Sequence, residues 1–307
     1  MKQDSNDGTA DQSPIPHFIV PRRQSRLMAL SIVIAALSLA MVRGGLSQDG
    51  RAFEVMPVPA SDGSGRSLLV NVMRPEGKGP FPLVVINHGS PAQANERPSM
   101  QVPTFNRLSR WLVTQGYVVA LPLRRGYGAV GGSWDEAYGP CGRPDYIKGG
   151  RETARDIQAA IDGLLQKDFV RKQNVVVIGQ SAGGWGTLAL ASQNPKNVIG
   201  YVNFAGGRGG HRNNTPNDNC TPDALVQAAS EFGKTARRPS LWIYTENDSF
   251  FAPALVKRMY QQYQAGGGQA TLHILPPVGH DGHQAISDEK GFALWSPVLA
   301  QFLKGLR

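Results

Sequence analysis

A short segment in the middle of the chain constrains the fold more than any other part of the sequence. A β-branched run at 175–178 leads into Gly-Gln-Ser-Ala-Gly at 179–183, and a helix-forming run follows at 187–191. A strand that passes into a helix through so short a turn holds its serine in a strained backbone conformation, for which the flanking glycines leave room. The segment therefore predicts that the Ser181 hydroxyl stands clear of a sheet, above the free N–H groups that begin a helix.

This segment has two interpretations. In the first, Ser181 is a nucleophile, because a hydroxyl at the tip of such a bend is accessible to a substrate. In the second, the segment is an ordinary glycine-rich turn with an incidental serine, since patterns of five residues also occur by chance. The strand before the turn and the helix after it favour the nucleophile, because they are the structural context that the pattern requires.

The rest of the chain predicts the architecture around this bend. Apolar and β-branched runs alternate with amphipathic, helix-forming segments, and an antiparallel hairpin is expected over 51–74. Strands that alternate with helices pair in parallel through right-handed crossovers. We therefore predict a three-layer α/β fold with a mostly parallel central sheet and helices on both faces. The later expected strands are 80–87, 117–121, 175–178, 198–204, 240–245 and 270–275, and the expected helices are 105–115, 152–165, 187–191, 224–232, 252–264 and 295–306.

The N-terminal part of the chain differs from the rest. Three arginines within 22–26 precede an apolar run at 27–42, a pattern typical of a secretory signal. The run is short for a spanning helix, which requires about 20 residues, but an uncleaved membrane anchor is the alternative. We therefore predict a leader over 1–49 and one catalytic domain over 50–307. The protein is then exported, periplasmic or secreted, and its only expected contact with a membrane is through the leader if that leader is not cleaved.

The net charge of +9 raises the question of a nucleic-acid partner. The basic residues are scattered, however, and adjacent arginines occur only at 22–23, 124–125 and 237–238. No basic helix and no alternation of basic and aromatic residues is present. The charge is therefore that of a solvated surface, and no nucleic-acid partner is expected. Nothing in the sequence predicts an oligomeric state.

The chain contains two cysteines, Cys141 and Cys220, both in segments that read as loops. An oxidising compartment would allow them to form a disulfide, and the alternative is two free thiols. No Cys-x-x-Cys is present, so neither a thiol redox site nor a zinc ribbon is expected.

A nucleophilic serine needs a base within hydrogen-bond reach, and the base needs a group that orients it. In a fold of this class the chain order is serine, acid, histidine, with the last two on loops that follow later strands. Glu246 and Asp248 follow the expected strand at 240–245. We assign the acid to Asp248, with Glu246 as its competitor. The alternative is that both are solvated carboxylates on a surface loop.

The candidate bases are His280 and His283, which follow the expected strand at 270–275. Gly282 lets the backbone turn freely just before His283, so His283 is favoured and His280 is the alternative. A metal site made of the two histidines and Asp281 would need further ligands, and none of suitable spacing is nearby. No metal is therefore expected.

A serine mechanism also requires two backbone donors aimed at the developing oxyanion. The N–H of Ala182, directly after the nucleophile, is one candidate. The second is the N–H of Ser90, in the loop after the strand at 80–87, where Gly89 permits a close approach. His88 precedes this loop and is expected to hold it.

Substrate contacts are expected from Arg125, Tyr127 and Trp185. The aromatic residues of the loop at 126–150 line a pocket in one interpretation and only anchor the loop in the other. Arg125 holds a substrate carboxylate in one interpretation, whereas in the other it forms a structural ion pair, which is the more common role of such a residue.

Four motifs together resemble the α/β-hydrolase superfamily: Gly-Gln-Ser-Ala-Gly-Gly at 179–184, His-Gly-Ser-Pro at 88–91, Asp248 after a strand, and Asp-Gly-His at 281–283. Within it the chain looks most like dienelactone-hydrolase-type proteins, and Arg-Gly-Tyr-Gly at 125–128 is similar to the acyl-peptidase group. The resemblance implies a serine hydrolase that passes through an acyl-enzyme and needs no cofactor. The best-known dienelactone hydrolases use a cysteine nucleophile, so the serine at this position favours ordinary esters.

Three functions follow from these interpretations. The first is hydrolysis of a small-molecule carboxylic ester. The second is a serine peptidase, or aminoacyl-amide hydrolase, of the acyl-peptidase type. The third is a binding protein without catalysis, since one fold can host unrelated functions. The serine, the acid and the histidine favour an enzyme.

Overall fold

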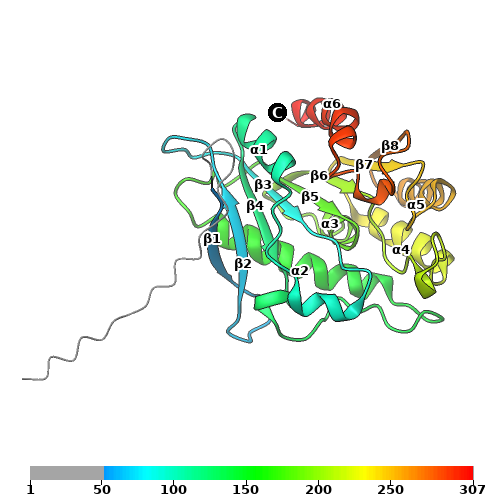
Figure 1. Cartoon of the computed structure of the whole chain (residues 1–307). Coiled ribbons are helices and arrows are strands. Elements are labelled where there is room, and N and C mark those ends of the chain that lie inside the picture. The colour runs from blue at the N-terminus through cyan, green and yellow to red at the C-terminus, as the bar shows by residue number, and fades with distance from the viewer. Residues whose placement is uncertain (1–51, 307) are drawn as a thin grey trace, which may run out of the picture. The chain divides into compact units, whose positions relative to one another are not determined.

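The computed structural model describes residues 52–306 (Figure 1). The predicted leader, its apolar run at 27–42 and the predicted domain boundary lie outside the described residues. Among the helices of residues 52–306, none is both long and apolar enough to cross a membrane.

A sheet of eight strands forms the framework, in the order β1-β2-β4-β3-β5-β6-β7-β8. The pairs β1–β2 and β2–β4 are antiparallel, and the pairs from β4 through β8 are parallel. This arrangement confirms the predicted hairpin and the mostly parallel sheet. The strands are β1 Glu54–Pro59, β2 Ser67–Met73, β3 Leu83–Asn87, β4 Val118–Leu123, β5 Val175–Gln180, β6 Val198–Phe204, β7 Ser240–Thr245 and β8 Ala270–Leu275.

Helices cover both faces of the sheet, as predicted (Figure 1). Successive residues of a strand point to opposite faces. In β3, Leu83 and Val85 belong to the core that contains α2–α5, whereas Val84 and Ile86 belong to the core that contains α1 and α6. The helices are α1 Asn106–Thr114, α2 Tyr146–Leu164, α3 Ala182–Ala191, α4 Pro222–Thr235, α5 Pro253–Ala265 and α6 Glu289–Gly305, with short 3₁₀ turns η1 Ala94–Ser99, η2 Gly128–Val130, η3 Arg212–Asn214 and η4 Gly282–Gln284.

Helix α2 begins at Tyr146 rather than at the predicted residue 152. The Asp145 carboxylate caps it by accepting a hydrogen bond from a backbone N–H of the first turn at 2.8 Å. Gly149 and Gly150 suggested a loop, but both lie inside the helix. A Cβ on Gly149 would lie 2.9 Å from the Glu136 carbonyl oxygen, and one on Gly150 would lie 3.1 Å from Ala189 Cβ in α3. These glycines therefore permit close packing and do not end the helix.

The parallel strands end at one edge of the sheet. Gln180 at the end of β5 lies opposite Phe204 at the end of β6, and Thr245 of β7 lies opposite Leu275 of β8. The loops that follow these strands therefore meet at the same edge, which is where open α/β sheets bind ligands. The predicted nucleophile, acid and base all follow strands that end here.

Cys141 and Cys220 form a disulfide, as predicted. It joins the loop before α2 to the loop between β6 and α4, and the Thr221 hydroxyl donates a hydrogen bond to the Cys141 carbonyl at 2.8 Å. Closing a loop of 79 residues restricts the unfolded chain, by about 4 kcal/mol in the chain-entropy account. A disulfide is compatible with an oxidising compartment and hence with the predicted export.

Candidate active site

The backbone at Ser181 has the conformation that the sequence predicts. Its φ of 53° and ψ of −121° lie in a region that residues other than glycine rarely adopt. A Cβ on Gly179 would lie 2.2 Å from the Gly183 carbonyl oxygen, and one on Gly183 would lie 2.5 Å from that of Asn87. The bend between β5 and α3 therefore requires a glycine on each side of the Gln-Ser-Ala sequence.

Two loops at the same sheet edge bring together a histidine and a carboxylate. His283 Nδ1 lies 3.0 Å from Asp248 Oδ1 and 3.2 Å from Oδ2. A carboxylate can only accept, so Nδ1 carries the proton and the other ring nitrogen, Nε2, is left as a proton acceptor. Both side chains are buried, with exposed fractions of 3% for His283 and 1% for Asp248. The pair is thus shielded from competing water.

The residues after Asp248 fix both partners. The backbone N–H groups of Phe250 and Phe251 donate to Asp248 Oδ1 at 2.8 and 3.0 Å. The Phe250 ring stacks on the His283 ring, with 4.1 Å between centroids and 24° between the planes. The carboxylate is therefore held by the backbone, and the imidazole is held by the carboxylate at its edge and by an aromatic ring on its face.

Ser181 and His283 line the same cavity, which has a volume of about 410 Å³. Its wall also includes Phe105 and Phe250, which give it an apolar character. Within residues 52–306, no hydrogen bond joins the Ser181 hydroxyl to the His283 ring. Such hydrogen bonds are often long in the free enzyme and shorten when the substrate binds. The cavity thus places a hydroxyl and a proton acceptor on one accessible surface.

The loop after β3 approaches Ser181 closely because Gly89 lacks a side chain. A Cβ at this position would lie 2.4 Å from Gln180 Oε1 and 2.9 Å from Ser181 Cβ. The next residue, Ser90, lines a second cavity together with Ser181 and Ala182. Ala182 is the first residue of α3, so its N–H has no partner within the helix. The structure therefore places Ser90 and Ala182, the residues that carry the two predicted N–H donors, on a cavity wall with Ser181.

His88 holds this loop, as expected. Its Nδ1 lies 2.7 Å from the Gly89 carbonyl oxygen, and the backbone N–H of Arg124 donates to its Nε2 at 3.3 Å. These partners require a neutral ring with the proton on Nδ1. Burial, with the nearby Arg124 guanidinium, lowers the pKa of His88 to about 3. The imidazole is therefore a structural link and not a base.

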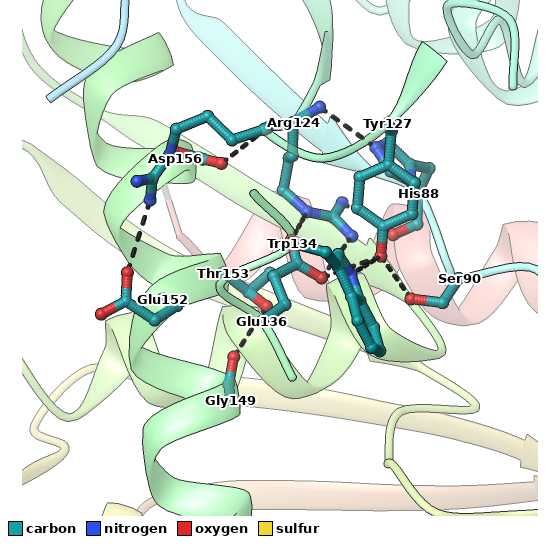
Figure 2. Close-up of polar contacts among 12 residues, drawn as sticks. His88, Ser90, Arg124, Tyr127, Trp134, Glu136, Gly149, Glu152, Thr153 and Asp156 are labelled. Atoms are coloured by element: carbon teal, nitrogen blue, oxygen red, sulfur yellow. Dashed lines mark hydrogen bonds and ion pairs between the residues drawn. The ribbon is translucent and has the colours of Figure 1, made fainter. Parts of the chain in front are cut away.

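Behind this loop lies a buried cluster of charges that the sequence did not predict (Figure 2). Arg124 and Arg208 both pair with a single carboxylate, Glu136. Burial alone would raise the pKa of Glu136, but the two guanidinium groups hold it well below its usual range. Glu136 is therefore ionised, and its one carboxylate is shared by two guanidinium groups.

Tyr127 connects this cluster to the loop (Figure 2). Its hydroxyl donates to Glu136 Oε2 at 3.0 Å and lies 2.5 Å from Ser90 Oγ. The Trp134 indole donates to the same hydroxyl at 2.9 Å. Tyr127 is fully buried and lies on neither cavity wall, so its position supports a role in holding Ser90 and not the predicted contact with a substrate.

Arg125 and Trp185 also lie away from both cavity walls, which corrects the prediction that they bind the substrate. Arg125 donates to Asp156 Oδ1 at 2.6 Å, and its remaining nitrogens pair with three further carboxylates, those of Asp62, Asp135 and Glu152. Arg125 therefore forms structural ion pairs, as in the second interpretation of this residue from the sequence. Trp185 is fully buried in the core and donates to the carbonyl oxygen of Tyr146 at 2.8 Å.

The competitors for acid and base lie away from the site. Glu246 is exposed, whereas Asp248 is buried against His283. His280 is exposed and is absent from the walls of both cavities. Of the four candidates, Asp248 and His283 are the two that contact each other. The geometry therefore favours Asp248 as the acid and His283 as the base, which is the assignment preferred from the sequence.

A second carboxylate, Asp281, links the two loops that carry Asp248 and His283. Asp281 Oδ1 accepts from the His283 N–H at 2.9 Å and from the Ser249 N–H at 3.0 Å, and Oδ2 accepts from the Ser249 hydroxyl at 2.6 Å. His211 Nε2 lies 2.8 Å from the same hydroxyl. Partial burial would raise the pKa of Asp281, but these hydrogen bonds lower it below its usual value.

Arg97, Arg208 and Phe250 are among the residues of the second cavity for which the sequence predicted no role. Arg208 stands within Gly-Gly-Arg-Gly-Gly at 206–210, directly after β6. The sequence signal that could have identified Arg208 is a single arginine within a run of glycines after a strand, because glycines let a loop approach a site closely. Arg97 lies in η1, and only the folded chain brings it near Ser181.

Comparison with known proteins agrees with this geometry. The profile of the prolyl oligopeptidase family, Peptidase S9, matches residues 103–198, which include the bend at Ser181. Dipeptidyl-peptidase 5 of Porphyromonas gingivalis is 26% identical over 126 residues. This match covers 41% of the present chain but only 17% of that protein. The chain thus corresponds to a small part of this relative.

Solved structures share the fold. An acylaminoacyl peptidase in complex with a chloromethyl ketone superimposes with a TM-score of 0.61 at 16% identity, over 83% of this chain and 41% of the peptidase. An esterase of Pyrococcus furiosus superimposes with a TM-score of 0.56 at 16% identity, over 83% of this chain and 92% of the esterase. At such identities the likeness shows the fold, which is that of these hydrolases.

Proposed function

We propose that this chain, which has the fold of known hydrolases and matches the prolyl oligopeptidase family over residues 103–198, is a serine hydrolase that cleaves small carboxylic esters through an acyl-enzyme. The observation that carries this proposal is the 3.0 Å contact between His283 Nδ1 and Asp248 Oδ1, on a histidine that shares a cavity with Ser181. The contact gives the serine a base and gives the base an orienting carboxylate.

In the first half of the reaction, Ser181 Oγ attacks the carbonyl carbon of the ester while His283 Nε2 takes the hydroxyl proton. The Asp248 carboxylate keeps the other ring proton on Nδ1 and stabilises the imidazolium that forms. The carbonyl oxygen becomes an oxyanion, and the N–H groups of Ala182 and Ser90 are the proposed donors to it. The tetrahedral intermediate then expels the alcohol, which leaves with the proton from Nε2.

In the second half, water attacks the acyl group on Ser181, and His283 Nε2 takes a proton from that water. A second tetrahedral intermediate collapses, the carboxylic acid leaves, and Oγ recovers its proton. The chain's contribution is the orientation of these groups. The strained bend holds Oγ, Phe250 holds the imidazole face, and the buried cluster behind Tyr127 holds the loop that carries Ser90.

Two observations support an ester as the substrate. The first is that an esterase of Pyrococcus furiosus shares this fold over 83% of the chain. The cavity beside Ser181 and His283 has apolar walls that suit an uncharged acyl or alcohol group.

A peptidase acting on short peptides or aminoacyl amides is the second candidate. It is favoured by the match of residues 103–198 to the prolyl oligopeptidase family and by the likeness to dipeptidyl-peptidase 5. The same three residues would cleave an amide, with His283 protonating the amine that leaves. The two candidates differ in the leaving group and not in the catalytic residues.

A fluorophosphonate probe tests the shared mechanism. We expect it to label Ser181 in the folded protein, and we expect Ser181→Ala to remove the labelling and to lower kcat by about 10⁵- to 10⁶-fold. Ser287→Ala is the matched control, because Ser287 lines the same cavity and takes no part in the proposed chemistry. A folded wild-type protein that is not labelled, yet binds ligands, would instead support a binding protein.

A matched pair of substrates separates the two candidates. A p-nitrophenyl ester and a p-nitroanilide with the same acyl group differ only in the bond cleaved. Hydrolysis of the ester, with at most slow turnover of the corresponding aminoacyl anilide, is the expected result. Efficient cleavage of aminoacyl anilides and no cleavage of short-chain esters would reverse the order of the two candidates.

A further inference from the structure

A second cavity, of about 290 Å³, also adjoins Ser181. It shares Ser90, Ser181 and Phe250 with the first cavity, and Ala182 also lines it. A substrate whose carbonyl group lies at Ser181 therefore extends one of its two parts into this space. The character of the second cavity then restricts what that part can be.

The charged residues on its wall are both cations. Arg97 and Arg208 line the cavity, and none of its lining residues is an aspartate or a glutamate. The remaining wall consists of aromatic side chains, small residues and the glycines around Arg208. None of the residues that line the first cavity is an arginine, lysine, aspartate or glutamate. The positive charge is therefore specific to the second cavity.

Arg208 is only partly neutralised by the protein. It is 4% exposed, and it shares the single carboxylate of Glu136 with Arg124. Its Nη2 donates to Glu136 at 2.7 Å and to Thr153 Oγ1 at 2.6 Å, but its buried Nε has no hydrogen-bond partner. Two buried guanidinium groups therefore share one directly paired carboxylate, and the buried Nε of Arg208 is a donor that no protein group accepts from, which is costly unless another group does so.

Arg97 is held in place without a carboxylate. Its guanidinium lies 3.8 Å from the centre of the Trp134 ring, and that ring is fixed by its hydrogen bond to the Tyr127 hydroxyl. Among residues 52–306, Arg97 forms no ion pair with an acidic side chain. Stacking orients the guanidinium plane and leaves its N–H donors for another group.

We propose that the second cavity binds a carboxylate carried by the substrate, so that the preferred substrates are esters or amides with an acidic group near the scissile bond. This inference rests on the proposed function. A substrate carboxylate supplies the acceptor that the buried Arg208 Nε lacks. Arginine donors match the two oxygens of a carboxylate, and the position beside Ala182 sets the group at short range from the scissile carbonyl.

The first experiment compares charged and neutral substrates of equal size. On the acyl side, p-nitrophenyl hemiglutarate is compared with p-nitrophenyl valerate, and on the alcohol side, 4-acetoxybenzoate with its methyl ester. We expect kcat/KM to be higher for the charged member of one pair, and the pair that shows this preference identifies which part of the substrate enters the cavity. The preference is expected to weaken as salt increases.

Arg97→Gln is the test variant, because Arg97 is half-buried and has no protein carboxylate to leave unpaired. It is expected to lower kcat/KM for the charged substrate by about tenfold or more and to change that of the neutral partner by less than about twofold. Arg212→Gln is the matched control: it removes the same charge from the loop that carries Arg208, but Arg212 lines neither cavity. It is expected to leave the preference unchanged.

A binding measurement separates this inference from the proposed catalysis. Glutarate is titrated calorimetrically into Ser181→Ala, with and without Arg97→Gln. Glutarate binding that weakens with Arg97→Gln supports the carboxylate site even if no ester or amide is hydrolysed. Equal use of charged and neutral substrates, together with glutarate binding that is absent or indifferent to Arg97→Gln, would overturn the inference while leaving the proposed hydrolase intact.

Discussion

Ser181 stands between two supports that are built in different ways. On one side, the loops after β7 and β8 hold Asp248 and His283 by short-range hydrogen bonds and by the stacked ring of Phe250. On the other side, the loop after β3 is held by a buried charge cluster, in which Arg124 and Arg208 share Glu136. The first support holds groups that take part in the proposed reaction, whereas the second positions the loop, and its Arg208 also lines the second cavity.

This difference predicts different consequences of mutation. Loss of a group in the first support removes a chemical role and leaves the fold intact. Loss of a group in the second leaves buried charges without partners and lowers the stability of the fold. Kinetic and stability measurements on the same variants therefore distinguish the two supports, and three substitutions are arranged below by the size of the expected effect.

Asp248→Asn is expected to have the largest effect, on kcat. An amide cannot keep the proton on His283 Nδ1 as a carboxylate does, so the wrong tautomer is favoured, and kcat is expected to fall by about 10⁴-fold. The side chain remains similar in shape, so the melting temperature is expected to change little. Glu246→Gln, in the same loop but exposed, is the control and is expected to retain full activity. Normal activity of Asp248→Asn would remove it from the proposed mechanism.

Glu136→Gln is expected to act on stability. It leaves Arg124 and Arg208 buried without a carboxylate, which costs about 3–5 kcal/mol in the free energy of unfolding. Denaturant unfolding measures this loss. The control is Glu231→Gln, which breaks an ion pair with Lys234 on the surface and is expected to cost less than about 1 kcal/mol. Similar small losses for both variants would show that the cluster does not support the fold.

Asp281→Asn is expected to have the smallest effect and to depend on pH. At neutral pH it weakens the hydrogen bonds that tie Ser249 to His283, at a cost of about 1–2 kcal/mol in stability and a several-fold loss in kcat. The pKa of Asp281 is lowered on folding, so the carboxylate stabilises the native state above its unfolded pKa of about 3.9 and ceases to do so as the pH falls through its lower folded pKa.

The difference in unfolding free energy between wild type and Asp281→Asn is therefore expected to be constant from pH 7 down to about pH 5 and to shrink below pH 4. Denaturant titrations at several pH values measure it. A difference that stays the same down to pH 3 would mean that the ionised carboxylate contributes nothing beyond what an amide provides.

The sequence by itself determined the fold class and the position of the bend. Both depend on local patterns: the strand and helix periods, and the glycines at 179 and 183 that a sharp turn requires. The order serine, acid, histidine also follows from the chain, because parallel strands present their carboxyl ends at one edge of the sheet. These inferences needed no knowledge of which side chains touch.

Only the tertiary structure decided which side chains contact each other. Arg124 and Arg125 are neighbours in sequence, yet one joins Glu136 behind the loop after β3 and the other joins Asp156. Arg97 and Arg208 are 111 residues apart in number (208 − 97), yet they line one cavity. Side-chain partners of this kind depend on long-range packing, which local periodicity does not encode. For the same reason Gly149 suggested a loop, although it lies where α2 packs closely against a neighbouring segment.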